Sequence, residues 1–161
     1  MNVKEAVIGR RNIKQFKPDP IPNEQLMEWL DAASYAPNHR MAQPWDVLVI
    51  GPETREKLNH KANFGDAPVV LAIVAHGAGT EMDREENLTA AASFVQNFSL
   101  VAYEAGVGVR WTSVGGKAEN REILGVSEGD VVVGVIGVGH PTDVPAPKTR
   151  TPMAEKTRYL P

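Results

Sequence analysis

Three cations close to the N-terminus are the first residues of this sequence whose types and spacing suggest ligand binding. Arg10, Arg11 and Lys14 crowd around Asn12 in a chain whose formal net charge is -3. A guanidinium group matches a phosphate with two parallel hydrogen bonds. Each charge-assisted hydrogen bond contributes roughly 1.5 to 3 kcal/mol net, so two or three would supply most of a micromolar affinity of about 8 kcal/mol. The stretch therefore predicts a site for an anion, and a phosphate monoester fits it.

The same cations have a structural alternative. Asn2 is expected to cap a short helix that passes through Ala6 and stops near Gly9. Arg10 and Arg11 follow the C-terminus of that helix. Cations there complement the partial negative charge of the helix end and stabilise it by roughly 0.3 to 1 kcal/mol. Taken alone, the stretch favours this structural role over ligand binding.

Length and composition exclude several classes of protein. The 161 residues suffice for one domain, expected over 1–140, and 42% hydrophobic with 23% charged residues is a globular balance. The acidic excess offers no basic face for DNA or RNA. No apolar run is long enough for a transmembrane helix of about 20 residues. Cysteine is absent, which excludes disulfides and zinc–thiolate sites and favours a reducing cytoplasm.

Other motifs fail on their spacing. The glycines of 134–139 imitate a dinucleotide-binding fingerprint, but they lie in a predicted strand that opens no helix. Gly115 and Gly116, which precede Lys117, are wrongly spaced for a phosphate-binding loop. The histidines lie far apart and lack metal-ligand spacing: His39, His60, His76 and His140. We therefore predict no metal site, and no side chain is assigned a catalytic role.

The second expected helix follows a proline-rich turn and is amphipathic. Asn23 is expected to cap it, and its apolar stripe consists of Leu26, Leu30 and Ala33. Pro37 is expected to stop it, because the residue before a proline avoids helical geometry. The helix therefore presents one apolar face to a core.

The rest of the chain alternates between strands and helices. Strands are expected at 45–50, 67–75, 106–113 and 130–139. Further helices are expected at 52–62, 85–105 and 118–125. The tail over 141–161 is rich in proline and charge and cannot form a core of its own. This order predicts a three-layer α+β fold without internal repeats.

Several of these segments together resemble the nitroreductase family of FMN-dependent flavoproteins. The stretch RRNIKQF, the amphipathic helix, and the loop APNHRMAQPW before a strand occur in the order of the family's N-terminal signature. The segments FVQNFSLVAYEAGVG, GVRWTS and REILGVSEGDVVVGVIGVGHP resemble later parts of it, so the likeness covers nearly the whole chain. The loop is most similar to a compact, bacterial-type subgroup. The resemblance implies a sandwich with a mixed, mainly antiparallel sheet, built as an intimate homodimer with FMN at its interface.

The resemblance also implies roles for the N-terminal cations. Arg10 would bind the FMN phosphate, with Arg11 and Asn12 near the phosphate and the ribityl chain. Asn12 stands where the family usually has a serine, and it still donates and accepts hydrogen bonds. Lys14 would lie near the pyrimidine edge of the flavin, where a fixed ammonium stabilises the charge of the reduced ring.

Three further groups of residues complete the site that the resemblance implies. The loop residues Pro37, Asn38 and His39 would reach the flavin from the partner subunit. Gln43, at the family's conventional glutamine position before Pro-Trp, would also bind the cofactor. For His39 an ordinary exposed histidine is the alternative, and for Gln43 a structural turn.

Trp111, Thr112 and Ser113 would line the other side of the ring, although Trp111 could equally belong to the core. In the tail, Lys148 and Arg150 would close on the phosphate, or else remain solvated linker charges. The end of the tail would lie against the partner.

The implied activity is transfer of hydride from NAD(P)H through FMN to a small acceptor such as a nitroaromatic or a quinone, with ping-pong kinetics. The connection between the first two strands, 51–66, is short for the family. It normally contributes helices and basic residues near the flavin. A flavin-binding or regulatory dimer without turnover therefore stays open as an alternative, as does a specialised dehalogenating or flavin-degrading relative.

Overall fold

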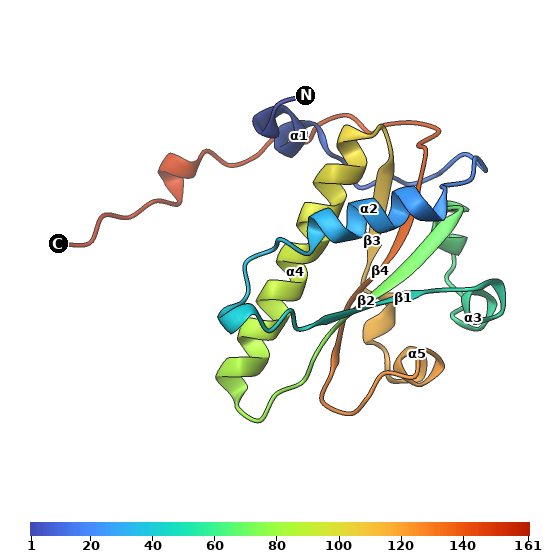
Figure 1. Cartoon of the computed structure of the whole chain (residues 1–161). Coiled ribbons are helices and arrows are strands. Elements are labelled where there is room, and N and C mark those ends of the chain that lie inside the picture. The colour runs from blue at the N-terminus through green and yellow to red at the C-terminus, as the bar shows by residue number, and fades with distance from the viewer.

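The computed structural model describes residues 1–161 and shows a sheet of four strands between two layers of helices (Figure 1). The strands are β1 (Trp45–Val49), β2 (Val69–Ala75), β3 (Gly108–Thr112) and β4 (Val131–Gly139). Their order in the sheet is β1-β2-β4-β3, and every pair of neighbours is antiparallel. A parallel contact occurs at the isolated bridge between Asn12 and Val109. The expected α+β sandwich is thus confirmed.

The two central strands are apolar on both faces because helices cover both sides of the sheet. In β2, Leu71 and Ile73 point into one hydrophobic cluster, whereas Val70 and Ala72 point into another. Side chains alternate between the two faces of a strand, so a strand covered on both sides has no position left for a polar residue. The apolar runs in the sequence are nearly continuous because both faces of these strands are covered.

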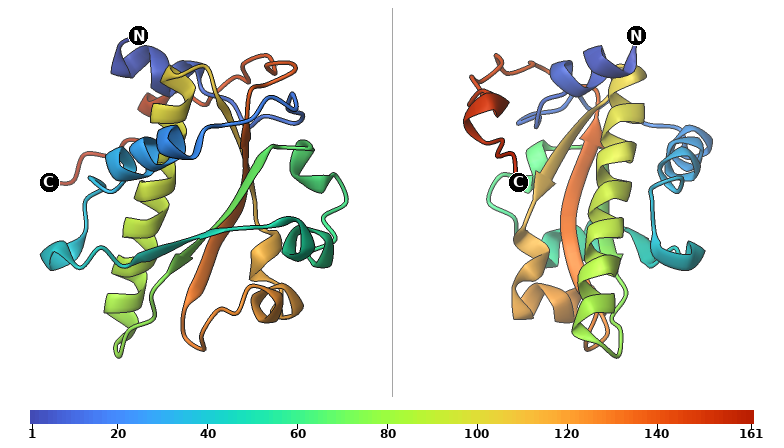
Figure 2. Two further views of the ribbon diagram at one scale, coloured as in Figure 1. Left: turned by 45° about the vertical axis from the view of Figure 1, so that its right-hand side comes forward. Right: turned by 90° about the vertical axis from the view of Figure 1, so that its left-hand side faces the viewer.

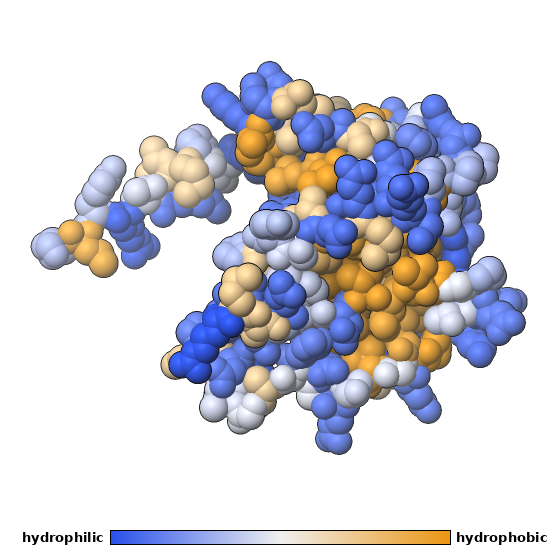
Figure 3. Space-filling view, viewed as in Figure 1, coloured by the Kyte–Doolittle hydropathy of each residue, from blue (hydrophilic) through white to orange (hydrophobic).

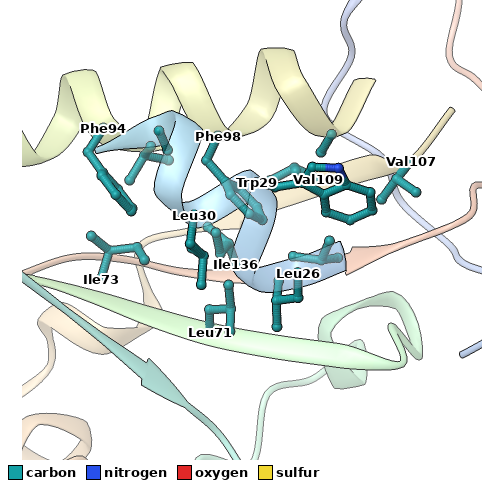
Figure 4. Packing of buried hydrophobic residues seen from close by; sticks show 14 of the residues in the cluster. Leu26, Trp29, Leu30, Leu71, Ile73, Phe94, Phe98, Val107, Val109 and Ile136 are labelled. Atoms are coloured by element: carbon teal, nitrogen blue, oxygen red, sulfur yellow. The ribbon is translucent and has the colours of Figure 1, made fainter. Parts of the chain in front are cut away.

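The larger cluster lies between the sheet and two helices, α2 (Asn23–Ala33) and α4 (Glu81–Glu104). Figure 4 shows its interior, where side chains of α2 and α4 meet those of the strands. Leu26 and Leu30 are buried as expected, and Trp29 joins them. Each such side chain contributes roughly 1.5 to 3 kcal/mol on burial.

The opposite face is covered by two short helices, α3 (Pro52–Lys57) and α5 (Ala118–Ile123), and by the turn that follows α3 (Figure 2). Phe64 in that turn is fully buried against Val135 of β4 and its neighbours. The shortened connection between β1 and β2 therefore consists of α3 and a tight turn that fills this face.

Local signals placed most helix ends correctly. Helix α1 (Val3–Gly9) begins with the expected cap, in which Asn2 and Glu5 exchange side-chain and backbone hydrogen bonds. Helix α4 ends before Gly106, whose φ of 75° suits glycine. It begins at Glu81 rather than 85, because the Thr80 hydroxyl caps it by accepting from the Asp83 N–H.

Three further expected helix ends were wrong. Asn23 is inside α2 and makes no capping bond, because Pro22 takes the cap position. The same helix ends at Ala33, so Pro37 lies beyond its C-terminus rather than stopping it. Helix α3 ends at Lys57 instead of 62, because Asn59 has a φ of 42° and turns the chain out of the helix.

The first residues of the C-terminal tail stay on the body of the molecule, where the Thr142 N–H donates to the Gln15 carbonyl at 3.1 Å. The rest of the tail extends away from it (Figure 1). Residues 146–161 are all exposed, including a single short turn at Met153–Glu155. None of the helices is both long enough and apolar enough to cross a membrane.

Candidate functional site

The N-terminal cationic stretch lies along the edge strand β3. The backbone N–H of Ile13 donates to the carbonyl oxygen of Val109 at 3.0 Å, and that of Phe16 donates to Gly65 at 2.9 Å. Ile13 and Phe16 are buried, whereas the side chains of Asn12 and Lys14 are exposed. Two apolar anchors thus hold the stretch in place and leave its polar side chains facing outward.

Arg11 fills the structural role that the sequence left open. Its Nη1 donates to the carbonyl oxygens of Ile8 at 2.6 Å, Gly9 at 3.0 Å and Arg10 at 2.9 Å. These carbonyls belong to the C-terminal end of α1, where helical acceptors lack partners. Arg11 is therefore largely committed to closing the helix, although its Nε is buried without a partner.

Unlike Arg11, Arg10 does not use its guanidinium to bind the carbonyl oxygens at the end of α1. Its side chain makes no hydrogen bond within the chain, and its Nε is buried without a partner. It lines a cavity of about 150 Å³ together with Tyr103, Val109, Pro141 and others. A buried donor without an acceptor is costly, and most such groups in native proteins have a partner. The Arg10 guanidinium is thus available to an anion.

The residues expected on the other side of the ring lie directly beside this stretch. The backbone N–H of Trp111 donates to Oδ1 of Asn12 at 2.7 Å. Its indole Nε1 donates to the Val133 carbonyl at 3.2 Å, which leaves the side chain 38% exposed rather than in the core. Thr112 uses its hydroxyl inside the sheet, donating to Val135 at 2.8 Å. Ser113 is exposed where β3 ends.

A second group of residues next to Lys14 was not predicted from the sequence. Arg110, on the opposite face of β3 from Trp111, donates to the Lys14 carbonyl. The imidazole Nδ1 of His60 accepts from the Phe64 N–H at 2.9 Å, and the two rings stack with centroids 4.4 Å apart. Burial, aided by the nearby Arg110, lowers the pKa of His60 below its ordinary value of 6.5. The only sequence signal was the position of Arg110 next to Trp111.

A polar network fixes the turn after α3 onto the N-terminal stretch. Arg55 donates to the Asn63 side chain at 2.8 Å and to the Ala67 carbonyl at 2.6 Å. Asp66 accepts from Gln15 at 2.6 Å and from Asn63 at 2.8 Å, and these bonds lower the pKa of its carboxyl. Hydrogen bonds from Gln15 to Asp66 and from Phe16 to Gly65 consequently join the turn to the N-terminal stretch.

Backbone strain is concentrated in two loops. All non-glycine residues with positive φ belong to them: Arg40, Met41 and Gln43 in one, and Asn59, Asn63, Phe64 and Asp66 in the other. Such conformations cost of the order of 1 to 3 kcal/mol each and tend to gather at binding sites. Both loops belong to the candidate site, one as its predicted partner loop and the other beside Lys14.

The loop over 37–43 is held by Asn38. Its Nδ2 donates to the Ala36 carbonyl at 3.0 Å, and its Oδ1 accepts from the Gln43 N–H at 2.9 Å. His39 lies 3.9 Å from a carboxylate oxygen of Glu86 on α4, and both side chains are about half exposed. The loop thus rests on α4 near the helix N-terminus.

Within one chain this loop lies far from α1, the helix that Arg10 directly follows (Figure 1). The end of α1 packs on the C-terminal part of α4, where a Cβ on Gly9 would lie 2.3 Å from the Tyr103 hydroxyl. Glu86 and Tyr103 are separated along the axis of α4 by about 25 Å at 1.5 Å per residue. A ligand the size of a flavin ring system cannot touch both groups in the same chain.

The tail cations are also apart from Arg10. Pro141 and Val144, at the start of the tail, line the Arg10 cavity. Lys148 and Arg150 lie further on, exposed, and contact each other through a bond of 3.3 Å from the Arg150 guanidinium to the Lys148 carbonyl. The structure of one chain does not bring them to the cavity.

Known proteins resemble this chain over nearly its full length. A family model described as "Nitroreductase family" matches residues 7–63 and 55–140, two segments that meet in the connection between β1 and β2. YfhC of Bacillus subtilis, assigned by name to the NAD(P)H nitroreductases, is 29% identical over 96% of this chain and 92% of its own.

Solved structures agree with this match. A nitroreductase-like family protein from Bacillus cereus superposes with a TM-score of 0.90 and 26% identity, covering 99% of this chain and 96% of its own. The NADPH:FMN oxidoreductase from Vibrio harveyi shares the fold, with a TM-score of 0.86 at 22% identity over 97% of this chain and 76% of its own. The compact size of the chain thus has a counterpart in the Bacillus cereus protein.

Proposed function

The chain belongs to the nitroreductase family, and we propose that it is an FMN-dependent oxidoreductase that uses NAD(P)H to reduce a small electron acceptor. The observation that carries the proposal is the half-buried Arg10 side chain, whose buried Nε has no partner and which lines a small cavity at the start of the signature stretch. The names of relatives support it, because they include NAD(P)H nitroreductases and an NADPH:FMN oxidoreductase. A cytoplasmic location, where NAD(P)H is available, is part of the proposal.

The residues present fit FMN. Arg10 would bind the phosphate, and the buried Nε of Arg11 offers a second donor beside it. Asn12 is already occupied by Trp111, so it would position that residue rather than bind the ribityl chain through Oδ1. When bound, FMN supplies two-electron transfer between a nicotinamide and an acceptor such as a nitroaromatic or a quinone.

The remaining groups would orient the ring and its charge. The exposed ammonium of Lys14 would stabilise negative charge at the pyrimidine edge, and Arg110 holds the Lys14 backbone in place. Trp111 presents part of its indole as an apolar wall. No side chain has to act as a nucleophile, and we assign none.

A complete site requires a second copy of the chain, and we propose a homodimer. The loop with Asn38 and His39 would reach the flavin bound at Arg10 of the other protomer, because about 25 Å separates the two groups within one chain. Lys148 and Arg150 would likewise close on the phosphate from the tail.

Exposed apolar surface supports such an assembly. Val3 and Ile8 on α1 are 77% and 62% exposed, and Tyr159 and Leu160 in the tail are 94% and 89% exposed. Figure 3 also shows a hydrophobic area on the face that carries α2 and β1. Val49 at the end of β1 is exposed. Contiguous apolar surface such as the area in Figure 3 is characteristic of surfaces that bind another protein.

Absorbance spectroscopy of the purified protein tests the function. We expect a flavin spectrum that NADH or NADPH bleaches and that a nitroaromatic or quinone restores. A colourless protein that binds no added FMN would contradict the cofactor assignment.

The short connection between β1 and β2 favours one alternative, a flavin-binding dimer without turnover. This segment supplies only α3 and a turn to the site region. A flavin spectrum that neither nicotinamide bleaches would support that alternative and exclude the enzyme.

A further inference from the structure

A second, larger hollow lies on the face of the sheet covered by the short helices. It has a volume of about 600 Å³ and opens between the segment after α3 and the segment that leads into α5. Figure 2 shows these two helices next to each other. Leu58, Val114 and Ile123 supply its apolar wall, and Leu58 is buried. Val114 directly follows Ser113, so the hollow adjoins the proposed flavin site.

The rim of this cleft is positively charged in a chain of negative net charge. Lys57, Lys61, Lys117 and Glu119 all line it, so three positive charges and one negative give a local charge of +2. The Lys117 ammonium is 3.9 Å from the Glu119 carboxylate, but both side chains are well exposed. Exposed ion pairs are weak, so Lys117 stays available to a ligand.

His60 adds a neutral hydrogen-bond donor to the same cleft. Its Nδ1 accepts from the Phe64 N–H, so in the neutral ring the proton is on Nε2. That Nε2 has no partner within the chain, while stacking on Phe64 holds the ring in place. An apolar wall, mobile ammonium groups and one fixed neutral donor together suit a ligand with an aromatic part and a phosphate.

We propose that this cleft binds the adenosine end of the nicotinamide reductant, and that its lysines recognise the 2'-phosphate that distinguishes NADPH from NADH. The inference rests on the proposed function, because it takes NAD(P)H as the reductant. The apolar wall would contact the adenine, and Lys57, Lys61 and Lys117 would surround the phosphate. Since the cleft begins at Val114, the reductant would extend from the flavin into it along one continuous surface.

Calorimetric titration with adenosine fragments tests the site without any turnover. We expect adenosine 2',5'-bisphosphate to bind more tightly than adenosine 5'-monophosphate and to weaken as salt is added. Replacing Lys57, Lys61 or Lys117 with alanine should weaken the bisphosphate roughly fivefold each. Lys4→Ala, an exposed change on α1, is the matched control and should leave it unchanged.

Steady-state kinetics provide the second readout. The KM for NADPH should rise in the three lysine variants while the KM for NADH and the flavin content stay at wild-type values. Equal affinity of the wild type for the two adenosine fragments would overturn the inference, as would lysine variants that bind the bisphosphate normally. A protein without flavin or NAD(P)H oxidation would contradict the proposed function, yet lysine-dependent bisphosphate binding would still establish the cleft as a phosphate site.

Discussion

The side chain of Asn12 accepts a hydrogen bond of 2.7 Å from the backbone N–H of Trp111, a residue 99 positions further along the chain. This bond attaches the cationic stretch to β3 at the point where the exposed indole begins. It therefore sets the relative positions of three groups that the proposed site needs, Arg10, Lys14 and Trp111. A departure from the serine usual in the family has a structural use here.

Two substitutions at Asn12 should separate stability from binding. Asn12→Ala removes the acceptor and should lower the free energy of unfolding by about 1 kcal/mol. Asn12→Asp keeps an acceptor oxygen but adds a negative charge near the phosphate, so stability should stay near the wild type while FMN binding weakens. Urea denaturation and FMN fluorescence titration measure the two effects. The proposed role of the bond is refuted if Asn12→Ala unfolds at the wild-type midpoint with an unchanged slope.

The adjacent arginines should respond differently to removal. Arg10→Ala should weaken FMN binding by about 1.5 to 3 kcal/mol, because charge-assisted bonds to the phosphate are lost. Arg11→Ala should mainly destabilise the fold, by roughly 0.3 to 1 kcal/mol, because its guanidinium closes α1. Flavin retention after gel filtration and thermal unfolding report the two quantities. Equal flavin retention in the Arg10→Ala variant and the wild type would remove the phosphate assignment.

The centre of the sheet leaves no room for a side chain at one position. A Cβ on Gly137 would lie 2.7 Å from the Phe64 carbonyl oxygen and 3.0 Å from the Ala67 side chain. Gly137→Ala should therefore destabilise the fold by about 1 to 3 kcal/mol. Gly79→Ala meets no atom within 4 Å and serves as the control, expected within about 0.5 kcal/mol of the wild type. Chemical denaturation of both variants measures the two free energies of unfolding and tests this expectation.

Stability should depend on pH through His60. Its folded-state pKa is lowered, so the unfolded chain binds the proton more readily. The stabilisation is thus complete above pH 6.5, the ordinary value, and is lost as the pH falls through the lowered folded-state pKa. The free energy of unfolding, measured between pH 8 and pH 5, should therefore decrease as the pH falls below 6.5. His60→Gln should make this decrease smaller. A His60→Gln variant with the wild-type slope would assign the effect to other groups.

Mixed dimers should recover sites that neither parent has. Arg10→Ala would impair the proposed phosphate side, and Asn38→Ala would release the loop that is proposed to close on the flavin from the partner. In a mixed dimer one site carries both changes and the other carries none. A 1:1 mixture refolded together should regain roughly a quarter of the wild-type FMN sites, because half of random dimers are mixed and each has one intact site. No recovery would mean that each site is built within one chain.

Much of the fold could be predicted from local patterns. The alternation of strands and helices, the apolar strands covered on both faces, and the ends of helices at Asn2 and Gly106 all depend on residues close together in sequence. Caps, glycines with positive φ and hydrophobic periodicity act over a few residues, so they can be recognised directly in the sequence. The anion site expected at the cationic stretch rests on the same kind of local pattern and stays a prediction.

The tertiary structure alone decided how the site is divided. Arg10 and Arg11 are adjacent and chemically identical, yet packing against α4 leaves one free and commits the other to α1. His60 and Arg110 come together because the turn after α3 packs against β3 and β4. Such contacts depend on strand order and on the direction in which each side chain leaves its strand. A local pattern contains neither kind of information. The cationic stretch could therefore be found in the sequence, but the different roles of Arg10 and Arg11 could not be predicted from it.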